Sequence, residues 1–456
     1  MAKKTSIDDL KQSLKAAGVR YFFGAYVDGL GVPKSKSVPI DHLENAATGS
    51  ELYTVGALEA MGALGPNEDE CVGVPDLATT VVLPWNRRYA IAFADLQFKG
   101  APYSHCSRTV LKRQVAAAAA MGWRVNMGVE PEVYVLRREE GVWKPFVAED
   151  TYNKPTRGYD IETTILAEPF LEPMVQYIDE LGWGVYSCDH EGGHGQYEFD
   201  FGYTDVLAMA DRMVLFRLMA KHVARSLGCI ATFMPKPWSD GFGSGAHLNI
   251  SLADLKSGRN AFTASNPAKS RGGHGYSDLA YHFTAGVLKH ASAIAAVVSP
   301  TVNSYKRLTP RGYMNEMSWA PVYRAYGHNN RTLMCRLPMN RSCLELRNAD
   351  SAVNFYLGAA LTVAAGLEGV RGKLNPGEAV DFNTYDVPEE ELERRGILRL
   401  PRTLGEAVEA FAADEVAKAV FGPEFHASYT SYKRAEWRDY CLVVGEWERE
   451  KYLHLW

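Results

Sequence analysis

Short stretches of the chain alternate apolar and polar residues with a period of two, which is the pattern of half-buried β-strands. In the first hundred residues these runs are separated by turn sequences rich in Gly, Pro, Asn and Asp. The runs are residues 20–28, 34–40, 79–85 and 89–96. Residues 1–18 have the pattern of a short amphipathic helix. The N-terminal part is therefore predicted to be a small, sheet-rich domain.

The pattern changes after residues 100–102, Gly-Ala-Pro, where a strongly helical segment begins. Ser107 is a suitable N-cap for this helix, which is expected to end at Gly122. We place a domain boundary here and predict domains of residues 1–102 and 103–456. In the second domain, strands alternate with long helices, an α+β arrangement. Helices are expected at residues 165–182, 205–227 (capped by Thr204), 277–298 and 350–369, and strands at 125–136, 188–200, 231–252 (two strands and a loop), 334–338 and 344–347.

Composition narrows the class of protein. The 456 residues are 46% hydrophobic and can bury a large core, and the formal net charge of −5 gives no reason to expect nucleic acid as a partner. We see no secretory leader and no apolar run long enough to cross a bilayer. The seven cysteines are scattered and odd in number, which favours reduced thiols in a cytoplasmic protein.

Candidate chemistry lies on the polar faces of the predicted strands. Residues 188–200, CDHEGGHGQYEFD, hold two glutamates on either side of a glycine-rich bend, and VEPEVY, GSGAHLNIS and CLELRN repeat the same polar alternation. In an ExE spacing both carboxylates leave the same side of a strand, so Pro131 between them should lie at an edge or a bulge. The six groups are Glu130, Glu132, Glu191, Glu198, His247 and Glu345.

Each of these features has an ordinary explanation when taken alone. An ExE pair is more often solvated, a histidine beside glycines is usually structural, and Arg347 beside Glu345 could form a cross-strand ion pair. Together, however, five glutamates on apolar strands would be prohibitively costly to bury without cations. Carboxylate oxygens suit Mg²⁺, and one imidazole adds tolerance of Mn²⁺. The coincidence predicts a cavity that holds a pair of hard divalent ions.

At these residues the chain resembles the glutamine synthetase superfamily over nearly its full length. The matching segments occur in family order: NMGVEPEVYVL, GQYEFDF, ATFMPKPWSDGFGSGAHLNISL, NSYKRLTP, NRTLMCRLP and LELRNAD. The resemblance implies a β-grasp N-terminal domain and a catalytic domain built on a curved antiparallel sheet with helices. It also implies active sites between subunits of hexameric rings, stacked as a homododecamer through the aromatic C-terminal tail.

The resemblance also implies roles for individual residues. Glu132, Glu191 and Glu198 would hold the first metal ion, and Glu130, His247 and Glu345 the second. Gly243, Glu132, His247 and Arg307 would position L-glutamate. Arg331 and Arg336 would contact the phosphoryl group of ATP. Arg347 would lie at the reaction centre, and Arg307, Arg331 and Arg347 would be the catalytic groups. Ser251 would contact the nucleotide. The adenine pocket would involve residues 153–159, and Tyr385 matches a tyrosine that some members adenylylate, although an exposed loop tyrosine is an equal explanation.

Three departures concern the amine. Ammonia-using members carry an Asp-Gly-Ser-Ser segment in the N-terminal domain, where this chain has YTVGALEAMG at residues 53–62. Their flap glutamate is replaced by MNEMSWAP, with Trp319 nearest and Glu316 displaced, and an asparagine of the glutamate-binding loop is Phe242. We therefore expect Tyr53, Val55 and Trp319 to offer apolar surface to a methylated amine.

This pattern most resembles the branch that makes γ-glutamylmethylamide from glutamate, methylamine and ATP. The main alternative is a divergent glutamine synthetase that uses ammonia; a γ-glutamylpolyamine ligase and a catalytically silent relative are less favoured, the latter because every matched metal ligand is present.

Overall fold

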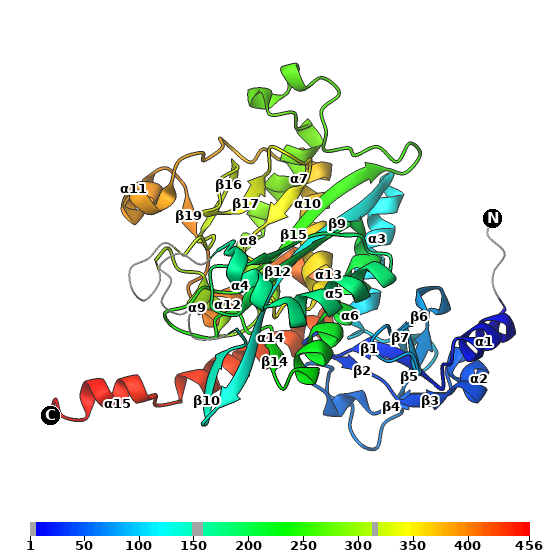
Figure 1. The fold of residues 1–456 in the computed structure, drawn as a ribbon. Helices are drawn as coiled ribbons and strands as arrows, with labels where there is room; N and C mark the ends of the chain where they lie inside the picture. The colour runs from blue at the N-terminus through cyan, green and yellow to red at the C-terminus, as the bar shows by residue number, and fades with distance from the viewer. Residues whose placement is uncertain (1–5, 148–157, 312–317) are drawn as a thin grey trace.

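The computed structural model describes residues 6–147, 158–311 and 318–456, and it contains two β-sheets that follow each other in the chain (Figure 1). The first sheet lies in the N-terminal region, and the second forms the centre of the remaining chain. We first describe the N-terminal sheet, and then the larger sheet that carries the polar strand faces.

The N-terminal sheet has eight strands, and its central pair, β1 and β7, runs parallel. The strand order along the main path is β2-β1-β7-β5-β4. Its strands are β1 (Tyr21–Val27), β2 (Pro33–Lys34), β3 (Ser37–Pro39), β4 (Leu52–Tyr53), β5 (Cys71–Pro75), β6 (Val81–Val82), β7 (Tyr89–Phe98) and β8 (Ala101–Pro102). The accompanying helices are α1 (Ile7–Ala16), η1 (Ile40–His42), α2 (Leu43–Ala47), η2 (Val55–Ala57) and η3 (Leu77–Thr79). The predicted runs all contain strands, and β4, β5 and β8 add to them.

The second sheet has eleven strands and is largely antiparallel. Its main path is β11-β12-β9-β15-β18-β17-β16-β19, in which β16 and β17 pair in parallel. Its strands are β9 (Trp123–Glu139), β10 (Val142–Pro145), β11 (Val185–His190), β12 (Gln196–Phe201), β13 (Thr204–Asp205), β14 (Ile230–Thr232), β15 (Ala246–Asp254), β16 (Tyr323–His328), β17 (Leu333–Leu337), β18 (Leu344–Leu346) and β19 (Leu398–Arg399). The predicted α+β fold is confirmed, with one parallel pair added to it.

Strand β9 is the longest strand of the sheet and organises its neighbours. Along one edge it pairs with β15, and along the other it pairs with β13 at residues 126–127 and with β12 at residues 132–134. Pro131 lies between the pairings with β13 and β12. At this edge no hydrogen bond of the sheet is lost through its missing N–H. Val129 and Val133 are buried in the main hydrophobic cluster. Because side chains alternate along a strand, Glu130 and Glu132 project from the opposite face.

Helices cover the second sheet and pack on one another. The central helix α10 packs against α7 and α3, and α12 lies between α8 and α14. The helices are α3 (Ser107–Ala120), α4 (Ile161–Leu166), α5 (Glu168–Glu180), α6 (Val206–Ser226), η5 (Pro267–Lys269), η6 (Arg271–Gly273), α7 (Asp278–Lys289), α8 (Ala291–Val298), α9 (Ser304–Arg307), α10 (Phe355–Gly372), η7 (Thr384–Asp386), α11 (Glu389–Arg394), α12 (Leu404–Ala413), α13 (Glu415–Phe421), α14 (Pro423–Cys441) and α15 (Glu446–Tyr452).

Helix boundaries differ from the sequence predictions in several places. Cys106, not Ser107, precedes the first turn of α3, and it makes no side-chain cap. Asp205, not Thr204, caps α6, and its carboxylate accepts from the N–H groups of Leu207 and Ala208. The helix expected at residues 277–298 is broken at His290 into α7 and α8, and the one expected at 165–182 begins earlier and is divided between α4 and α5. The last of the predicted helices begins at Phe355, after an Asn354 cap, not at residue 350.

The two sheets are joined by buried polar contacts. The guanidinium of Arg108 on α3 donates to Asp211 on α6 at 3.1 Å and to Asp95 on β7 at 3.1 Å. The amide of Asn354 donates to the backbone oxygens of Asp28 and Gly29 in the turn after β1. These contacts hold the N-terminal region against the helical layer.

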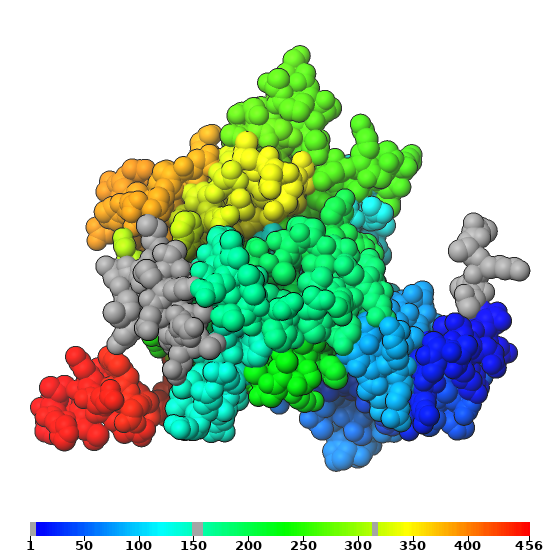
Figure 2. Space-filling view, viewed as in Figure 1, coloured from blue at the N-terminus to red at the C-terminus, as the bar shows by residue number. Residues whose placement is uncertain are grey.

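The C-terminal helix α15 extends away from the body of the molecule (Figures 1 and 2). The helix and the residues after it are largely exposed and carry a series of large apolar side chains: Trp447, Tyr452, Leu453, Leu455 and Trp456. Within the described ranges, no helix combines the length and apolar character that crossing a bilayer requires.

Candidate active site

Strand register brings the predicted polar groups together on one face of the second sheet. Glu198 lies opposite Glu132 across β12 and β9, and His247 lies opposite Glu130 across β15 and β9. Glu345 on β18 lies opposite Asn249 on β15. Neighbouring strands are about 4.8 Å apart, so residues from four strands converge on one cavity.

Glu130, His247 and Glu345 form a compact group. One ligand atom from each lies within 4.8 Å of the other two. Nδ1 of His247 is 3.1 Å from Oε2 of Glu130 and 3.8 Å from Oε1 of Glu345. Two carboxylates and an imidazole at this spacing could hold a divalent cation.

Arginines surround the buried carboxylate of Glu345. Arg336 Nη1 lies 2.7 Å from Oε2, and Arg347 Nη1 lies 2.5 Å from Oε1. Arg341 Nη2 is 3.2 Å from Oε2 and also contacts Oε1 of Glu130 at 2.6 Å. Burial by itself would raise the pKa of Glu345, but Arg347, His247 and the other arginines outweigh it and hold the pKa at about 2. This half of the cavity is thus rich in cationic groups.

The other half has a surplus of negative charge. Burial, followed by the neighbouring charge of Glu191, raises the pKa of Glu132 to about 8. Burial and then Glu132 and Glu191 raise the pKa of Glu198 well above its ordinary value, and burial raises the pKa of Glu191 as well. Carboxylates in this state repel one another unless a cation lies between them. The donor set, all carboxylate oxygens, therefore fits a hard divalent ion such as Mg²⁺ or Mn²⁺.

Glu132 is held by groups on three other segments. The amide of Gln196 donates to its Oε2 at 2.6 Å and to the backbone oxygen of Gly243 at 3.1 Å. The hydroxyl of Ser351 donates to the backbone oxygens of Glu132 and Gly245, at 2.7 Å each. These contacts fix the acidic side chain and the glycine loop in a common frame.

The loop before β15 packs closely against Arg307. A Cβ atom built on Gly245 would lie 2.7 Å from Glu132 Oε1, 2.9 Å from Arg307 Nη2 and 3.0 Å from His247 Nε2. Arg307 is buried and donates to the backbone oxygens of Arg347 and Asn348. The backbone at Gly245 is therefore in close contact with an acid, a guanidinium and an imidazole, groups that can bind an amino acid.

The remaining predicted residues lie around this centre. Arg331 is exposed. Burial raises the pKa of Glu191, and the positive charge of Arg331 acts to lower it. The backbone oxygen of Arg331 accepts a hydrogen bond from Arg347 Nε at 3.3 Å. Gly243 lies against the side chain of Arg307. Ser251 is buried on β15, on the same strand face as His247. Residues 153–157 of the predicted adenine pocket, and Glu316, lie outside the described residues.

The prediction that Tyr53 and Val55 offer apolar surface to the methyl group of the amine needs correction. Tyr53 and Val55 are buried in a core cluster of the N-terminal sheet, so their side chains support the fold of their own chain. Trp319 is 55% exposed, and its backbone oxygen accepts from Arg347 Nη2 at 3.5 Å. The ring of Phe242 packs on Gly192, where a Cβ would lie 3.0 Å from the ring, next to Glu191. Phe242 and Trp319 are thus aromatic groups close to Glu191 and to Arg347.

Sequence reasoning did not single out Arg341 or Ser351. Arg341 lies in a turn before β18 and contacts Glu130 and Glu345, but nothing in MNRSC distinguishes it from a solvated loop arginine.

Tyr385 is half-buried, and its hydroxyl donates to the backbone oxygen of Ala320. It is therefore not the exposed loop tyrosine that the sequence also allowed.

Comparison with known proteins gives consistent matches. Residues 104–452 match the family model described as glutamine synthetase, catalytic domain. The chain is 38% identical to glutamate–methylamine ligase of Methyloversatilis universalis over 98% of this chain and 99% of that protein. It is 36% identical to glutamine synthetase of Rhizobium meliloti, over 97% and 98% of the two chains. A solved structure of a GmaS/ADP complex superposes with a TM-score of 0.89 at 33% identity, over 99% of this chain and all of that one.

Proposed function

This chain belongs to the glutamine synthetase family, and from that premise we propose that it joins methylamine to the γ-carboxyl group of L-glutamate. The products would be γ-glutamylmethylamide, ADP and phosphate. The observation that carries the choice of amine is the ring of Phe242, which packs on Gly192 beside Glu191. The similarity to a glutamate–methylamine ligase over the full chain supports the same choice.

The reaction must first activate a poor electrophile. A carboxylate resists attack by an amine, so the γ-carboxylate of glutamate attacks the γ-phosphorus of ATP, forming γ-glutamyl phosphate and releasing ADP. The amine nitrogen then attacks the acyl carbon, phosphate leaves, and the nitrogen loses a proton. Both steps move negative charge between phosphate oxygens, which cationic side chains can stabilise.

The acidic face would hold two divalent ions, Mg²⁺ or Mn²⁺. We assign Glu132, Glu191 and Glu198 to the first ion and Glu130, His247 and Glu345 to the second. The raised pKa values of Glu132 and Glu198 support the first assignment, because like charges held this close need a cation between them. When bound, such ions neutralise phosphate charge and orient the nucleotide.

The cationic side chains would divide between the two substrates. Arg307, with Gly243, Glu132 and His247, would bind the amino-acid end of glutamate beside Gly245. Arg331 and Arg336 would contact the transferred phosphoryl group, and Arg347 would lie beside the γ-carboxyl reaction centre. Ser251 would contact the nucleotide from β15. The contacts of Arg336 and Arg347 with Glu345 support this placement, because they hold both guanidinium groups at the cavity.

The amine would bind between Glu191 and aromatic surface. Methylammonium has one N–H donor fewer than ammonium and a methyl group that gains by leaving water. Phe242 would cover that methyl group and Trp319 would border the site near Arg347. The bound amine must lose a proton, and an alkylamine has a pKa near that of lysine, ~10.4. Turnover should therefore rise toward alkaline pH.

The test is phosphate release with glutamate and ATP, comparing methylamine, ammonium, ethylamine and putrescine by kcat/KM. We expect methylamine to be preferred, and a preference for ammonium would instead make the chain a divergent glutamine synthetase. In Phe242→Asn, the ratio of methylamine to ammonium kcat/KM should fall at least about tenfold, since one methyl group in an apolar pocket contributes ~1–3 kcal/mol. Because both amines are measured in the same variant, any effect on glutamate binding cancels in the ratio.

The active assembly would be a homododecamer of two stacked hexamers. In this arrangement the N-terminal domain of one subunit would complete the site of its neighbour, and α15 would dock on the opposite ring. The exposed apolar side chains of α15 and the residues after it support the docking of this segment, because Trp447 and Leu453 gain by burial against another surface.

A further inference from the structure

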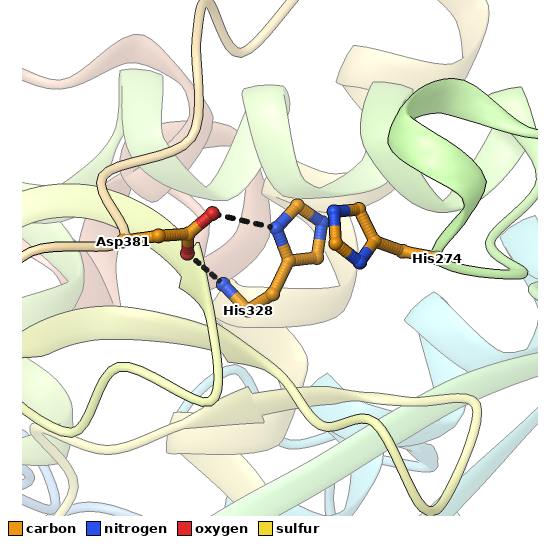
Figure 3. Close-up of side chains that lie close together, drawn as sticks. All are labelled: His274, His328 and Asp381. Carbon is orange, nitrogen blue, oxygen red and sulfur yellow. Dashed lines mark hydrogen bonds and ion pairs between the residues drawn. The ribbon is translucent and has the colours of Figure 1, made fainter.

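Two histidines and an aspartate meet at the end of strand β16 (Figure 3). His274 follows the short helix η6, His328 is the last residue of β16, and Asp381 comes from the segment before η7. One ligand atom from each lies within 4.8 Å of the other two. The strand β17 separates β16 from β18, which carries Glu345. This group has no place in the proposed reaction.

The carboxylate of Asp381 is held in a fixed position. It accepts from the backbone N–H of His328 at 2.6 Å and lies 3.1 Å from the ring Nδ1 of the same residue. Its chain segment is tied down on both sides, because Val380 N–H donates to Tyr326 at 2.9 Å and the amide of Asn330 donates to the backbone oxygens of Val380 and Phe382. The carboxylate is therefore positioned by the backbone rather than by solvent.

Gly327 makes this close approach possible. A Cβ atom at that position would lie 2.4 Å from the backbone oxygen of Val380 and 3.0 Å from Oδ1 of Asp381. Any larger residue would push the segment that carries Asp381 away from β16. The local sequence thus brings a carboxylate against a histidine that ends a strand.

The imidazole of His328 is oriented from two sides. Its side chain is only 8% exposed, and the hydroxyl of Tyr281 lies 3.3 Å from Nε2. Burial lowers the pKa of His328, although Asp381 opposes that effect. The side chain of Asp381 is 44% exposed, so the group can be reached from solvent.

His274 brings the second imidazole. Its ring stacks on that of His328, with centroids 3.6 Å apart and an angle of 18° between the planes. It lies in the sequence RGGHG, and the flanking Gly272, Gly273 and Gly275 all have positive φ, a conformation that glycine adopts freely. The ring can therefore turn on its loop without disturbing a strand.

We propose that His274, His328 and Asp381 form a binding site for one nitrogen-preferring divalent transition ion, of which Zn²⁺ is the best example. Two imidazoles and one carboxylate suit such ions, whereas Mg²⁺ prefers oxygen ligands alone. The 3.1 Å between His328 Nδ1 and Asp381 Oδ2 is close to the spacing of two ligands on a tetrahedral ion, roughly 3.3 Å for bonds of ~2.0 Å. A rotation of His274 would bring in the third ligand, and water would complete the set.

The positive charge of Arg271 opposes the binding of a metal ion at this site, but the Arg271 side chain makes contacts of its own. Arg271 lies over the ring of Tyr281, with Cζ 5.1 Å from the centroid. Its guanidinium donates to Asn375 Oδ1 at 3.1 Å and to the Gly377 backbone oxygen at 2.6 Å. These contacts direct its charge toward the 375–377 loop.

The test uses the full chain with Mg²⁺ in excess, titrated with Co²⁺, whose visible absorption reports nitrogen and oxygen ligation. We expect one equivalent of Co²⁺ per chain that Zn²⁺ displaces. His274→Gln and Asp381→Asn should each weaken Co²⁺ binding at least about tenfold, because even outer-shell partners of metal ligands contribute about 10–100-fold. His274→Gln changes only a residue on a glycine loop, so its fold should be retained.

Two control variants separate this site from the acidic cavity. Glu130→Gln alters the cavity and should leave the Co²⁺ signal unchanged, as should His42→Gln, which replaces an exposed histidine in the N-terminal region. The proposal is overturned if His274→Gln binds Co²⁺ as tightly as the unmodified chain, if Glu130→Gln abolishes the signal, or if no Co²⁺ binds in excess Mg²⁺.

Discussion

The side-chain amide of Gln196 donates a hydrogen bond of 2.6 Å to Oε2 of Glu132, and both residues are buried. The same Gln196 accepts from the N–H of Gly193 at 2.9 Å, so the orientation of its amide is fixed. An oriented carboxylate is a better metal ligand than a mobile one, because it loses less freedom on binding.

Gln196→Leu removes this donor and keeps a buried side chain of similar size. We expect the Mg²⁺ concentration needed for half-maximal activity to rise about 10–100-fold, with activity recovering substantially at saturating Mg²⁺. A purely structural role would lower activity equally at all Mg²⁺ concentrations. Activity is therefore measured as a function of Mg²⁺.

Glu198→Ala removes one of the assigned ligands and should lower turnover at least about 100-fold, more than the loss of an outer-shell partner. The sheet should remain folded, since the change relieves repulsion with Glu132. Glu139→Gln is the control, because Glu139 is the last residue of β9 and pairs with Lys144. Near-normal activity of Glu198→Ala at limiting Mg²⁺ would remove this residue from the metal site.

Gly245→Ala should displace Glu132, Arg307 and His247, because the added Cβ would lie 2.7–3.0 Å from their polar atoms. Overpacking costs about 1–3 kcal/mol, so the KM for glutamate should rise about 5- to 150-fold. Gly241→Ala is the matched control in the same loop, because its Cβ would meet neighbours at ordinary contact distances of 3.6 Å and beyond. If both variants had the same KM for glutamate, the side chains around Gly245 would not form the glutamate site.

His290 should make stability depend on pH. Its Nδ1 lies 2.6 Å from Asp414, and its Nε2 lies 3.0 Å from Glu368. These two contacts connect the break between α7 and α8 to other helical segments. Burial alone would lower the pKa of His290, but the two carboxylates outweigh it and raise the pKa above its ordinary value. The resulting stabilisation is fully present below the pKa of the unfolded state, ~6.5, and is lost as pH rises through the folded-state pKa.

His290→Gln should therefore lower the free energy of unfolding more at pH 6 than at pH 9. Hydrogen bonds to charged groups contribute about 1.5–3 kcal/mol, and we expect a loss of that size at pH 6. The measurement is urea unfolding at fixed protein concentration. His282→Gln is the control, because His282 bonds a backbone carbonyl of Leu374 and no carboxylate. Equal losses for His290→Gln at both pH values would contradict the ion-pair explanation.

Removal of residues 447–456 should halve the mass of a dodecamer and leave turnover unchanged, because α15 lies outside the acidic cavity. Light scattering gives the mass, and Trp447→Ala with Leu453→Ala tests the same surface without shortening the chain. An unchanged mass in both variants would refute the docking role of the tail.

The sequence by itself determined which residues can share a face. A spacing of two in VEPEVY and AHLNIS puts Glu130 with Glu132, and His247 with Asn249, on one side of a strand whatever the rest of the chain does, because successive side chains alternate. Hydrophobic patterning likewise indicated most strands and helices, and the family resemblance predicted the polar groups that converge.

Only the tertiary structure decided how these strands align and what surrounds them. The register that sets Glu198 opposite Glu132 depends on packing across the whole sheet. Burial placed Tyr53 and Val55 in a core, and long-range contacts brought Arg341 to Glu130 and His274 onto His328. The N-cap of α6 is Asp205 rather than the predicted Thr204, because the cap that forms depends on local geometry. Such contacts join residues distant in the chain, and no local pattern encodes them.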